Sequence, residues 1–302
     1  MKLTLSICTH NHLAALKQTL TGLHNLYSPQ GAWELLIVDN ASPDGTGAWL
    51  AQGGWQRIDI DCRVVHENRL GVAHARNRAL AEAKGEYVVF LDDDETPEPD
   101  WLVNLEQVID FHHPAAIGGR IRAHLPNGRP DWLTGELLGF LGELDYGSAE
   151  RALTETSTPI FTGNAVFHRQ TVLDAGGFDS NLGRRGNIQS GGEDTELYRR
   201  LINLKKSVRW APQAIIHHRI EPWKLRRTYF LQLHYHQGRM EGARKRGHFS
   251  RLPPKYLVPQ LLRAYGQALA MRFKQGSAYS LRLEMNAAYF TGYVVGWIKD
   301  TA

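Results

Sequence analysis

Short apolar runs alternate with amphipathic stretches through the first two thirds of the chain. Residues 2–8, 33–38 and 88–91 are mostly apolar and are bounded by polar residues and turn formers, which is typical of buried strands. Residues 13–26 and 71–83 carry apolar side chains at helical spacing and predict helices. This alternation predicts an α/β fold with a Rossmann-like, mostly parallel central sheet flanked by helices.

Weaker sequence patterns predict the remaining helices and strands. Gly85 is expected to close the helix over 71–83 as its C-cap. Residues 125–158 are rich in glycine, leucine and aromatic side chains, and we interpret them as an insertion or lid. Further strands are expected at 63–66, 117–123, 160–167, 207–210 and 214–217, and further helices at 46–52, 98–111, 170–175, 193–204 and in several long stretches after 223.

Composition indicates a folded protein of a reducing compartment. The 302 residues are 42% hydrophobic and 22% charged, which is ordinary for a globular chain. The two cysteines, Cys8 and Cys62, suggest neither a disulfide framework nor a zinc site. No window approaches the roughly 20 apolar residues of a spanning helix, and the N-terminal run is too short for a signal peptide. We therefore expect a cytoplasmic location, with peripheral attachment to the inner face of the cytoplasmic membrane as an option.

Charge is distributed unevenly along the chain. Residues 205–302 hold 18 Lys and Arg against 4 Asp and Glu, whereas the remainder holds 17 and 27. Such a basic region suits an anionic partner, namely a lipid surface, a phosphate-bearing acceptor or nucleic acid. A solvated basic surface is the alternative.

Three adjacent carboxylates follow the apolar run 88–91. Asp92, Asp93 and Asp94 would lie at the carboxyl end of a central strand, where open α/β sheets bind their ligands. Neighbouring carboxylates repel one another unless a cation or hydrogen-bond donors offset their charge. Hard oxygen ligands suit Mg²⁺ or Mn²⁺. The pattern therefore predicts a divalent cation site, with a solvated acidic turn as the alternative.

Five motifs in order give the chain a resemblance to a known family. They are SICTHN at 6–11, IVDNASPDG at 37–45, NRLGVAHARN at 68–77, FLDDD at 90–94 and GEDTEL at 192–197. Together they resemble the family 2 glycosyltransferases with the GT-A fold, over about residues 3–220. The resemblance implies transfer of a sugar from a nucleotide-diphosphate donor to an acceptor hydroxyl, with inversion at the anomeric carbon.

The resemblance implies a donor site built from the first part of the chain. Asp39 matches the carboxylate that accepts a hydrogen bond from the nucleobase, as an imide N–H of uracil would require, and a UDP-type donor is therefore favoured. Thr9 and Asn11 match a loop that lines the base and ribose, and Arg76 matches an arginine at the base or diphosphate. The alternatives are a turn aspartate, a helix cap and an exposed surface arginine.

The acidic triplet matches the family's Asp-X-Asp motif. By resemblance Asp94 binds the divalent cation, Mn²⁺ or Mg²⁺, and Asp92 contacts the ribose or the donor sugar. Asp93 is either a water-mediated second ligand or only a neighbour. The cation would bridge diphosphate oxygens and stabilise charge on the leaving nucleoside diphosphate.

The acid pair at 193–194 matches the family's Glu-Asp pair. Asp194 is the predicted general base that takes the acceptor's proton, with Glu193 positioning the acceptor. Glu193 as the base is the alternative. Without a chemical role, both would simply be acids at a helix N-terminus.

Three further positions match the family less specifically. His217 or His218 is expected to complete the metal shell or touch the diphosphate, with His217 preferred. Asn164, after Gly163, matches a segment near the donor sugar, although a kink in a strand is equally consistent.

The resemblance sets the expected organisation and partners. Residues 1–220 form the predicted catalytic domain, with a nucleotide-sugar half at about 1–115 and an acceptor half at about 116–220. Residues 221–302 form a basic, helical C-terminal region. The expected acceptor is a glycan or lipid-linked glycan in the synthesis of cell-surface polysaccharide or glycoconjugate, and no nucleic acid partner is expected.

The C-terminal region has a row of apolar residues at every fourth position, with basic residues around it. The apolar row is Leu257, Leu261, Tyr265, Leu269 and Phe273, and the basic residues are Lys255, Arg263, Arg272 and Lys274. Three interpretations fit: an amphipathic helix on an anionic membrane leaflet, a helix docked on the catalytic domain, or the contact of a homodimer.

Two rival functions remain open from the sequence. A nucleotidyltransferase also pairs such a sheet with acidic metal ligands, but it should carry a glycine-rich phosphate loop after the first strand, and residues 9–12 contain no glycine. A non-catalytic glycan- or nucleotide-binding module of the same fold would have had no need to keep both the acidic triplet and the Glu-Asp pair.

Overall fold

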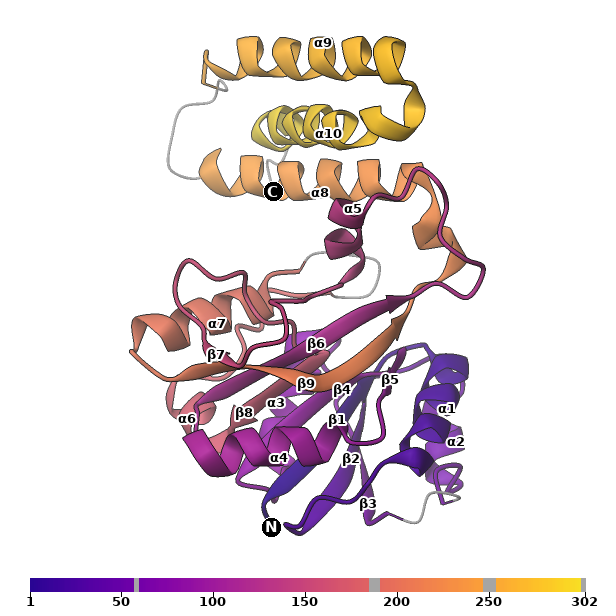
Figure 1. Ribbon diagram of the computed structural model, residues 1–302, viewed down its shortest axis with the longest axis vertical. Coiled ribbons are helices and arrows are strands. Elements are labelled where there is room, and N and C mark those ends of the chain that lie inside the picture. The colour runs from indigo at the N-terminus through magenta and orange to yellow at the C-terminus, as the bar shows by residue number, and fades with distance from the viewer. Residues whose placement is uncertain (57–59, 185–190, 247–253, 300–302) are drawn as a thin grey trace. The chain divides into compact units, whose positions relative to one another are not determined.

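The computed structural model describes residues 1–56, 60–184, 191–246 and 254–299. The chain forms two compact units (Figure 1). The sheet unit consists of Met1–His124 and Gly142–Arg219, and the helical unit consists of Leu125–Leu141 and Ile220–Ala302. The segment interpreted as one insertion is therefore divided, since its first part belongs with the C-terminal helices.

Four parallel strands form one half of the central sheet. In spatial order they are β3 (Cys62–His66), β2 (Trp33–Asp39), β1 (Leu3–Thr9) and β4 (Tyr87–Asp92). The apolar runs that predicted them are buried, and Leu5, Ile37 and Val89 have no exposed surface. Strands covered on both faces need such continuous apolar runs.

The other half of the sheet is mixed. β8 (Asn164–His168) runs antiparallel to both β4 and β6 (Ala116–His124), and β6 is parallel to β9 (Val208–Arg219). Two short strands, β5 (Glu95–Pro97) and β7 (Arg151–Ala152), pair antiparallel with β9.

The strands predicted at 207–210 and 214–217 are one strand, β9. The pairing of β9 with β6 shifts register between Ala211 and Ile215, on either side of Pro212. Proline lacks the N–H that a ladder needs, so it breaks the regular pairing without ending the strand. The sequence shows the interruption, and only the pairing shows the continuity.

Helices flank the sheet (Figure 1). They are α1 (Leu13–Gly22), η1 (Leu23–Asn25), α2 (Thr46–Ala51), α3 (Val72–Glu82), α4 (Trp101–His112), α6 (Arg169–Asp174) and α7 (Glu193–Asn203). The C-cap of α3 is Ala83 in an extended conformation, so the prediction for Gly85 is wrong. A Cβ at Gly85 would lie 2.5 Å from the backbone carbon of Leu3, which explains the glycine by close approach to β1.

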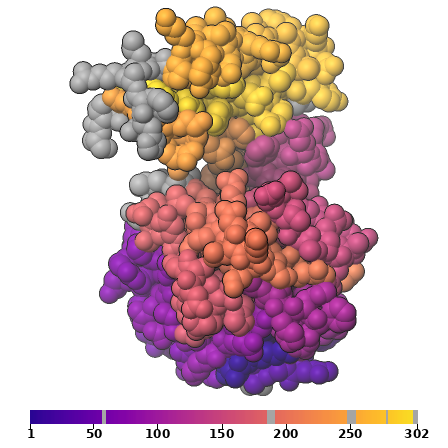
Figure 2. All heavy atoms as spheres, turned by 90° about the vertical axis from the view of Figure 1, so that its left-hand side faces the viewer, coloured from indigo at the N-terminus to yellow at the C-terminus, as the bar shows by residue number. Residues whose placement is uncertain are grey.

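The helical unit contains α8 (Arg227–Arg246), α9 (Leu257–Gln275) and α10 (Ser277–Lys299), with the short α5 (Gly135–Leu138), η2 (Gly139–Leu141) and η3 (Pro222–Leu225). α10 packs against both α8 and α9. Phe140 lies edge-on to His234 at 4.8 Å between ring centroids, and Figure 2 shows its segment in magenta beside the C-terminal helices. Within the described part of the chain, no helix is both long and apolar enough to cross a membrane.

Candidate active site

The site begins where β1, β2 and β4 end at one edge of the sheet. Thr9 lies opposite Asp39, and Cys8 lies opposite Asp92, in the parallel ladders. Parallel strands present their carboxyl ends at the same edge. The structure therefore brings together the strand-end residues that the sequence predicted for the donor site.

Asp39 lies buried at the end of β2. Its Oδ2 is 3.1 Å from Nδ1 of His66, and its Oδ1 accepts the backbone N–H of Ser42 at 3.3 Å. A Cβ at Gly47 would lie 2.8 Å from the same Oδ2, so the glycine leaves room beside the carboxylate. Asn11 lies in the facing loop, where its backbone N–H donates to the Ser42 hydroxyl and its side chain is exposed.

Asp93 organises the loop after β1. Its two carboxylate oxygens accept from Thr9 Oγ1 at 2.6 Å and pair with His12 Nδ1 at 2.9 Å. Burial raises the pKa of the Asp93 carboxyl, while the His12 contact opposes this shift. Through these two contacts Asp93 holds Thr9 and His12 in place.

Asp94 faces His218. The antiparallel ladder pairs Glu95 with His218 and Thr96 with His217. His218 Nε2 lies 3.4 Å from Asp94 Oδ2, whereas His217 Nε2 lies 3.2 Å from Glu98 Oε1. Successive side chains of a strand point to opposite faces, so only one of the two histidines can face the acidic cluster. The sequence favoured His217 for this place, and the structure puts His218 there.

Glu95 is a buried carboxyl that the motif analysis did not select. Its Oε2 accepts the backbone N–H of Asp92 at 2.9 Å. Burial, and then the charges of Asp92 and Asp94, raise the pKa of Glu95 well above its ordinary value. In the sequence, Glu95 could have been noticed only because it directly follows the acidic triplet. The fold shows that the Glu95 side chain is buried.

Arg76 joins the acidic strand end to the downstream acid pair. Its guanidinium is buried, donates to Glu193 Oε1 at 2.6 Å and lies 3.3 Å from Asp92 Oδ1. The guanidinium also lies over the Phe178 ring at 5.8 Å. This burial excludes the alternative of an exposed surface arginine, and the contact of Arg76 with the base or diphosphate stays a prediction. The acidic strand end at Asp92 and the acid pair at 193–194 are a hundred residues apart in sequence, and Arg76 joins them in one site.

Asp194 follows Glu193 in the first turn of α7. Burial, and then the charge of Glu193, raise the pKa of Asp194, while Arg76 lowers it. A carboxylate whose pKa is raised toward neutrality is a better proton acceptor. Within the described residues, Glu193 Oε2 is buried without a hydrogen-bond partner. The pair therefore combines a carboxyl of raised pKa with a buried carboxylate oxygen that has no hydrogen-bond partner among the described residues.

Asn164 is explained by contacts within the sheet. Its side chain has no exposed surface, and its Oδ1 accepts from Trp101 Nε1 at 2.8 Å. Its Nδ2 donates to the carbonyls of Arg120 and Ala214. These bonds tie β6, β8, β9 and α4 together, so a role at the donor sugar stays a prediction.

Asn40 is a second residue that the motif analysis did not select. Its buried amide donates to the carbonyls of Glu67 and Arg69 and accepts from the Gly71 N–H at 2.8 Å. These bonds fix the entry into α3, the helix that carries Arg76.

The donor set fits a divalent cation completed by a substrate. Within the described residues, no three His, Cys, Asp or Glu side chains converge as a ready-made metal site. Asp94 and His218 supply two donors, and Mg²⁺ or Mn²⁺ is commonly held by one or two protein ligands together with substrate phosphates. The neighbouring carboxylates of Asp92 and Asp94 favour a cation at the same edge.

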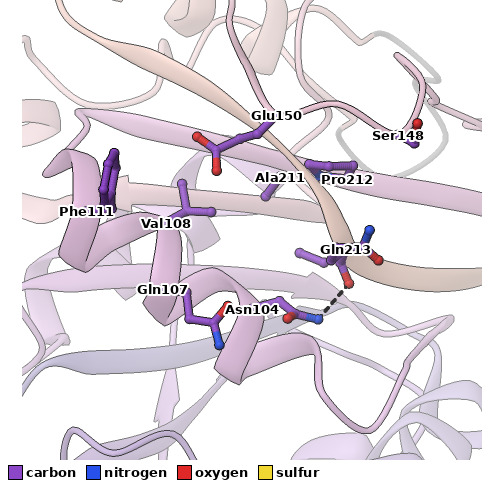
Figure 3. Close-up of a pocket in the computed structure, with 10 residues that line it drawn as sticks. Asn104, Gln107, Val108, Phe111, Ser148, Glu150, Ala211, Pro212 and Gln213 are labelled. Atoms are coloured by element: carbon purple, nitrogen blue, oxygen red, sulfur yellow. Dashed lines mark hydrogen bonds between the residues drawn. The ribbon is translucent and has the colours of Figure 1, made fainter.

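A separate pocket lies beside the middle of β9. It has a volume of about 420 Å³ and is lined by residues of α4, of 148–150 and of 211–214. Figure 3 shows Asn104 on one wall, where its Nδ2 donates to the Gln213 carbonyl at 2.9 Å. None of the residues that line this pocket belongs to the acidic strand end or to the acid pair at 193–194, so this pocket is distinct from the carboxylate site.

A family model decides the identity of the chain. The model described as glycosyl transferase family 2 matches residues 4–177, more than half of the chain. The chain belongs to glycosyl transferase family 2. The prediction of a glycosyltransferase is thereby confirmed at the level of the family.

Two relatives with assigned names support the membership of the chain in this family. The succinoglycan biosynthesis protein ExoM of Rhizobium meliloti is 26% identical over 245 residues, which cover 80% of this chain and 74% of that protein. The glucosyl-dolichyl phosphate glucuronosyltransferase of Haloferax volcanii is 28% identical over 193 residues, which cover 62% of this chain and 58% of that protein.

Solved structures confirm the predicted GT-A fold. The mannosyltransferase PcManGT of Pyrobaculum calidifontis, in complex with GDP-Man and Mn²⁺, superposes with a TM-score of 0.64 at 18% identity and covers 100% of this chain and 88% of its own. The S. aureus TarS 1–349 complex with UDP-GlcNAc has a TM-score of 0.58 at 15% identity and covers 98% and 91%. At such identities the likeness concerns the fold alone.

Proposed function

We propose that this family 2 enzyme is a metal-dependent, inverting glycosyltransferase that uses a nucleotide-diphosphate sugar, with UDP-type donors preferred. The observation that carries the proposal is the position of Arg76 between Asp92 and Glu193. A donor held by the strand-end carboxylates and an acceptor primed by the Glu-Asp pair would then meet in one site. A direct displacement requires a bound leaving group and an opposed base, and the two carboxylate clusters would supply these in our proposal.

Each residue has a defined role in this proposal. Asp39 accepts a hydrogen bond from the nucleobase, Thr9 and Asn11 line the base and ribose, and Asp92 contacts the ribose or donor sugar. Asp94 and His218 hold Mn²⁺ or Mg²⁺, which when bound would stabilise the charge of the leaving diphosphate. His218 replaces His217 in this role because of its distance to Asp94.

The chemical step is assigned to the chain's own carboxylates. Asp194 accepts the proton of the acceptor hydroxyl while the oxygen attacks the anomeric carbon from the face opposite the diphosphate. Glu193, fixed by Arg76 through one oxygen, offers the other oxygen to a hydroxyl group of the acceptor. Inversion follows from a single displacement.

The donor and acceptor classes are proposed from relatives and from chemistry. Neighbours of the same fold bind UDP-GlcNAc in one case and GDP-Man in another, so the preference for uracil rests on Asp39. ExoM is named for succinoglycan biosynthesis. We take the acceptor to be a hydroxyl of a glycan or lipid-linked glycan in the synthesis of cell-surface polysaccharide or glycoconjugate, at the cytoplasmic face of the membrane.

The proposal is tested by the conservative variant Asp194→Asn. We expect sugar transfer to fall by about 10³-fold or more because the proton acceptor is lost, while donor binding stays within about twofold of wild type. Transfer is followed with a panel of nucleotide sugars with and without Mn²⁺, and binding by thermal shift with the same panel. Near-normal transfer by Asp194→Asn would refute the assigned base, and binding without any transfer by the wild type would favour a non-catalytic module.

A further inference from the structure

The outer face of α9 exposes a continuous row of apolar side chains. Its members are Val258, Leu262, Tyr265, Leu269 and Phe273, each between 52% and 82% exposed. The residues that face the rest of the helical unit are Leu257, Ala264 and Ala268, all buried. At about 100° per residue the two sets lie on different sides of the helix, so the apolar row points away from the buried side, and the Tyr265 hydroxyl reaches Thr291 Oγ1 of α10 at 2.9 Å.

The observed row differs from the one that the sequence suggested. A strict four-residue repeat rotates by about 40° at each step, so a row from Leu257 to Phe273 turns from the buried side to the exposed side. Leu257 is accordingly 3% exposed, whereas Phe273 is 82% exposed. Val258 and Leu262 take the places on the exposed row that the repeat assigned to Leu257 and Leu261.

Cationic side chains border this row. Arg272 lies beside one edge of the row, and Arg263 and Lys274 lie about 80–100° beyond the other edge, all exposed. Arg272 pairs with Glu284 of α10 at 3.3 Å, and within the described residues no carboxylate lies within 4 Å of Arg263 or Lys274. No position of α9 is Asp or Glu. The face is therefore apolar along its centre, and every charged side chain that α9 itself supplies around it is cationic.

We propose that the outer face of α9 binds an anionic membrane surface, with the apolar row inserted among the lipid chains and the cations on the phosphate groups. An amphipathic helix in the plane of the interface needs this combination of an apolar face and basic borders. A second copy of the chain fits less well. A two-fold contact through α9 would bring the same cations against each other, with no acid on the helix to pair with them.

This surface is independent of the transfer chemistry, and its test needs no substrate. The full chain is mixed with phosphatidylcholine vesicles, with or without phosphatidylglycerol, and floated on a density gradient. We expect flotation with the anionic vesicles only. The double variant L262S/F273S should reduce the partition coefficient roughly tenfold or more, because two inserted apolar side chains are lost. R263E/K274E should reduce it as well, and high salt should weaken the binding of the wild type.

Phe111→Ser is the matched control. Phe111 of α4 is 81% exposed, as Phe273 is at 82%, but it lies in the sheet unit. Its variant should float like wild type. Failure of the wild type to bind anionic vesicles, or an equal loss in Phe111→Ser and L262S/F273S, would overturn the proposal. A wild-type dimer that L262S/F273S converts to a monomer, without flotation of either, would assign the face to a second copy instead.

Discussion

Arg76 is a buried cation that contacts one carboxylate from each half of the proposed mechanism. A buried guanidinium is tolerated only where opposite charges and hydrogen bonds compensate its desolvation, and here Asp92 and Glu193 supply them. The same charge opposes the raised pKa of Asp194. Arg76 therefore holds Glu193 in place through a hydrogen bond and also lowers the pKa of Asp194.

The pH dependence of transfer should report these charges. Asp194 must be ionised to accept a proton, so activity falls as the pH drops through its raised pKa. Glu193 raises that pKa and Arg76 lowers it, so Glu193→Gln should move the acid limb of kcat/KM to lower pH and Arg76→Gln should move it to higher pH. Glu196→Gln is the control, since Glu196 pairs with Arg200 in the same helix. Shifts of both variants in one direction would contradict the assignment.

The two neighbouring histidines offer a second test at this scale. His218 faces Asp94 and His217 faces Glu98. His218→Ala should weaken Mn²⁺-dependent binding of UDP roughly tenfold or more, and His217→Ala should leave it within about twofold. Calorimetric titration of UDP in the presence and absence of Mn²⁺ measures both. A larger loss in His217→Ala would restore the choice made from the sequence.

At the scale of elements, α8 and α10 pack through four glycines. A Cβ at Gly238, Gly242, Gly292 or Gly296 would lie between 1.9 and 2.1 Å from a carbonyl oxygen of the facing helix. Small residues four apart allow two helix backbones to approach this closely. Each glycine faces the backbone of the other helix. A larger side chain would therefore push the two helices apart, because no side chain could move to make room.

Gly292→Ala should therefore destabilise the helical unit. We expect a loss of about 1–3 kcal/mol in its free energy of unfolding, because the helices must separate. Gly266→Ala in α9 is the control, since its Cβ would meet nothing within 4 Å, and it should stabilise the unit by about 0.5–1 kcal/mol. Chemical denaturation followed by circular dichroism measures both, and equal effects would argue against the close packing.

Sequence patterns predicted the elements better than their pairing. The strands β1, β2 and β4 were evident because their apolar runs reflect burial on both faces, and their ends gave Thr9, Asp39 and Asp92. His218 faces Asp94 because of the register between β5 and β9. No local sequence pattern encodes that register. The burial of Arg76 likewise depends on α7 packing near α3.

At the scale of the whole molecule, each unit of the chain has hydrophobic packing of its own. One cluster of buried apolar side chains spans the sheet unit, and another, around Leu257, Tyr293 and Trp297, lies in the helical unit. The charge asymmetry in the sequence follows the same division, since the basic C-terminal residues belong to the helical unit. In our proposals the sheet unit binds the nucleotide and the helical unit binds the membrane surface.

Calorimetric unfolding should then show two transitions that respond to different changes. UDP with Mn²⁺ binds the sheet unit in our proposal, and a ligand at about 100 times its Kd adds roughly 2.7 kcal/mol of stability, which corresponds to a rise in Tm of roughly 5–10 °C for a domain of this size. The transition of the helical unit should not move. Gly292→Ala should have the opposite pattern, lowering the Tm of the helical unit alone. A single transition that both changes shift would mean that the two units unfold together cooperatively.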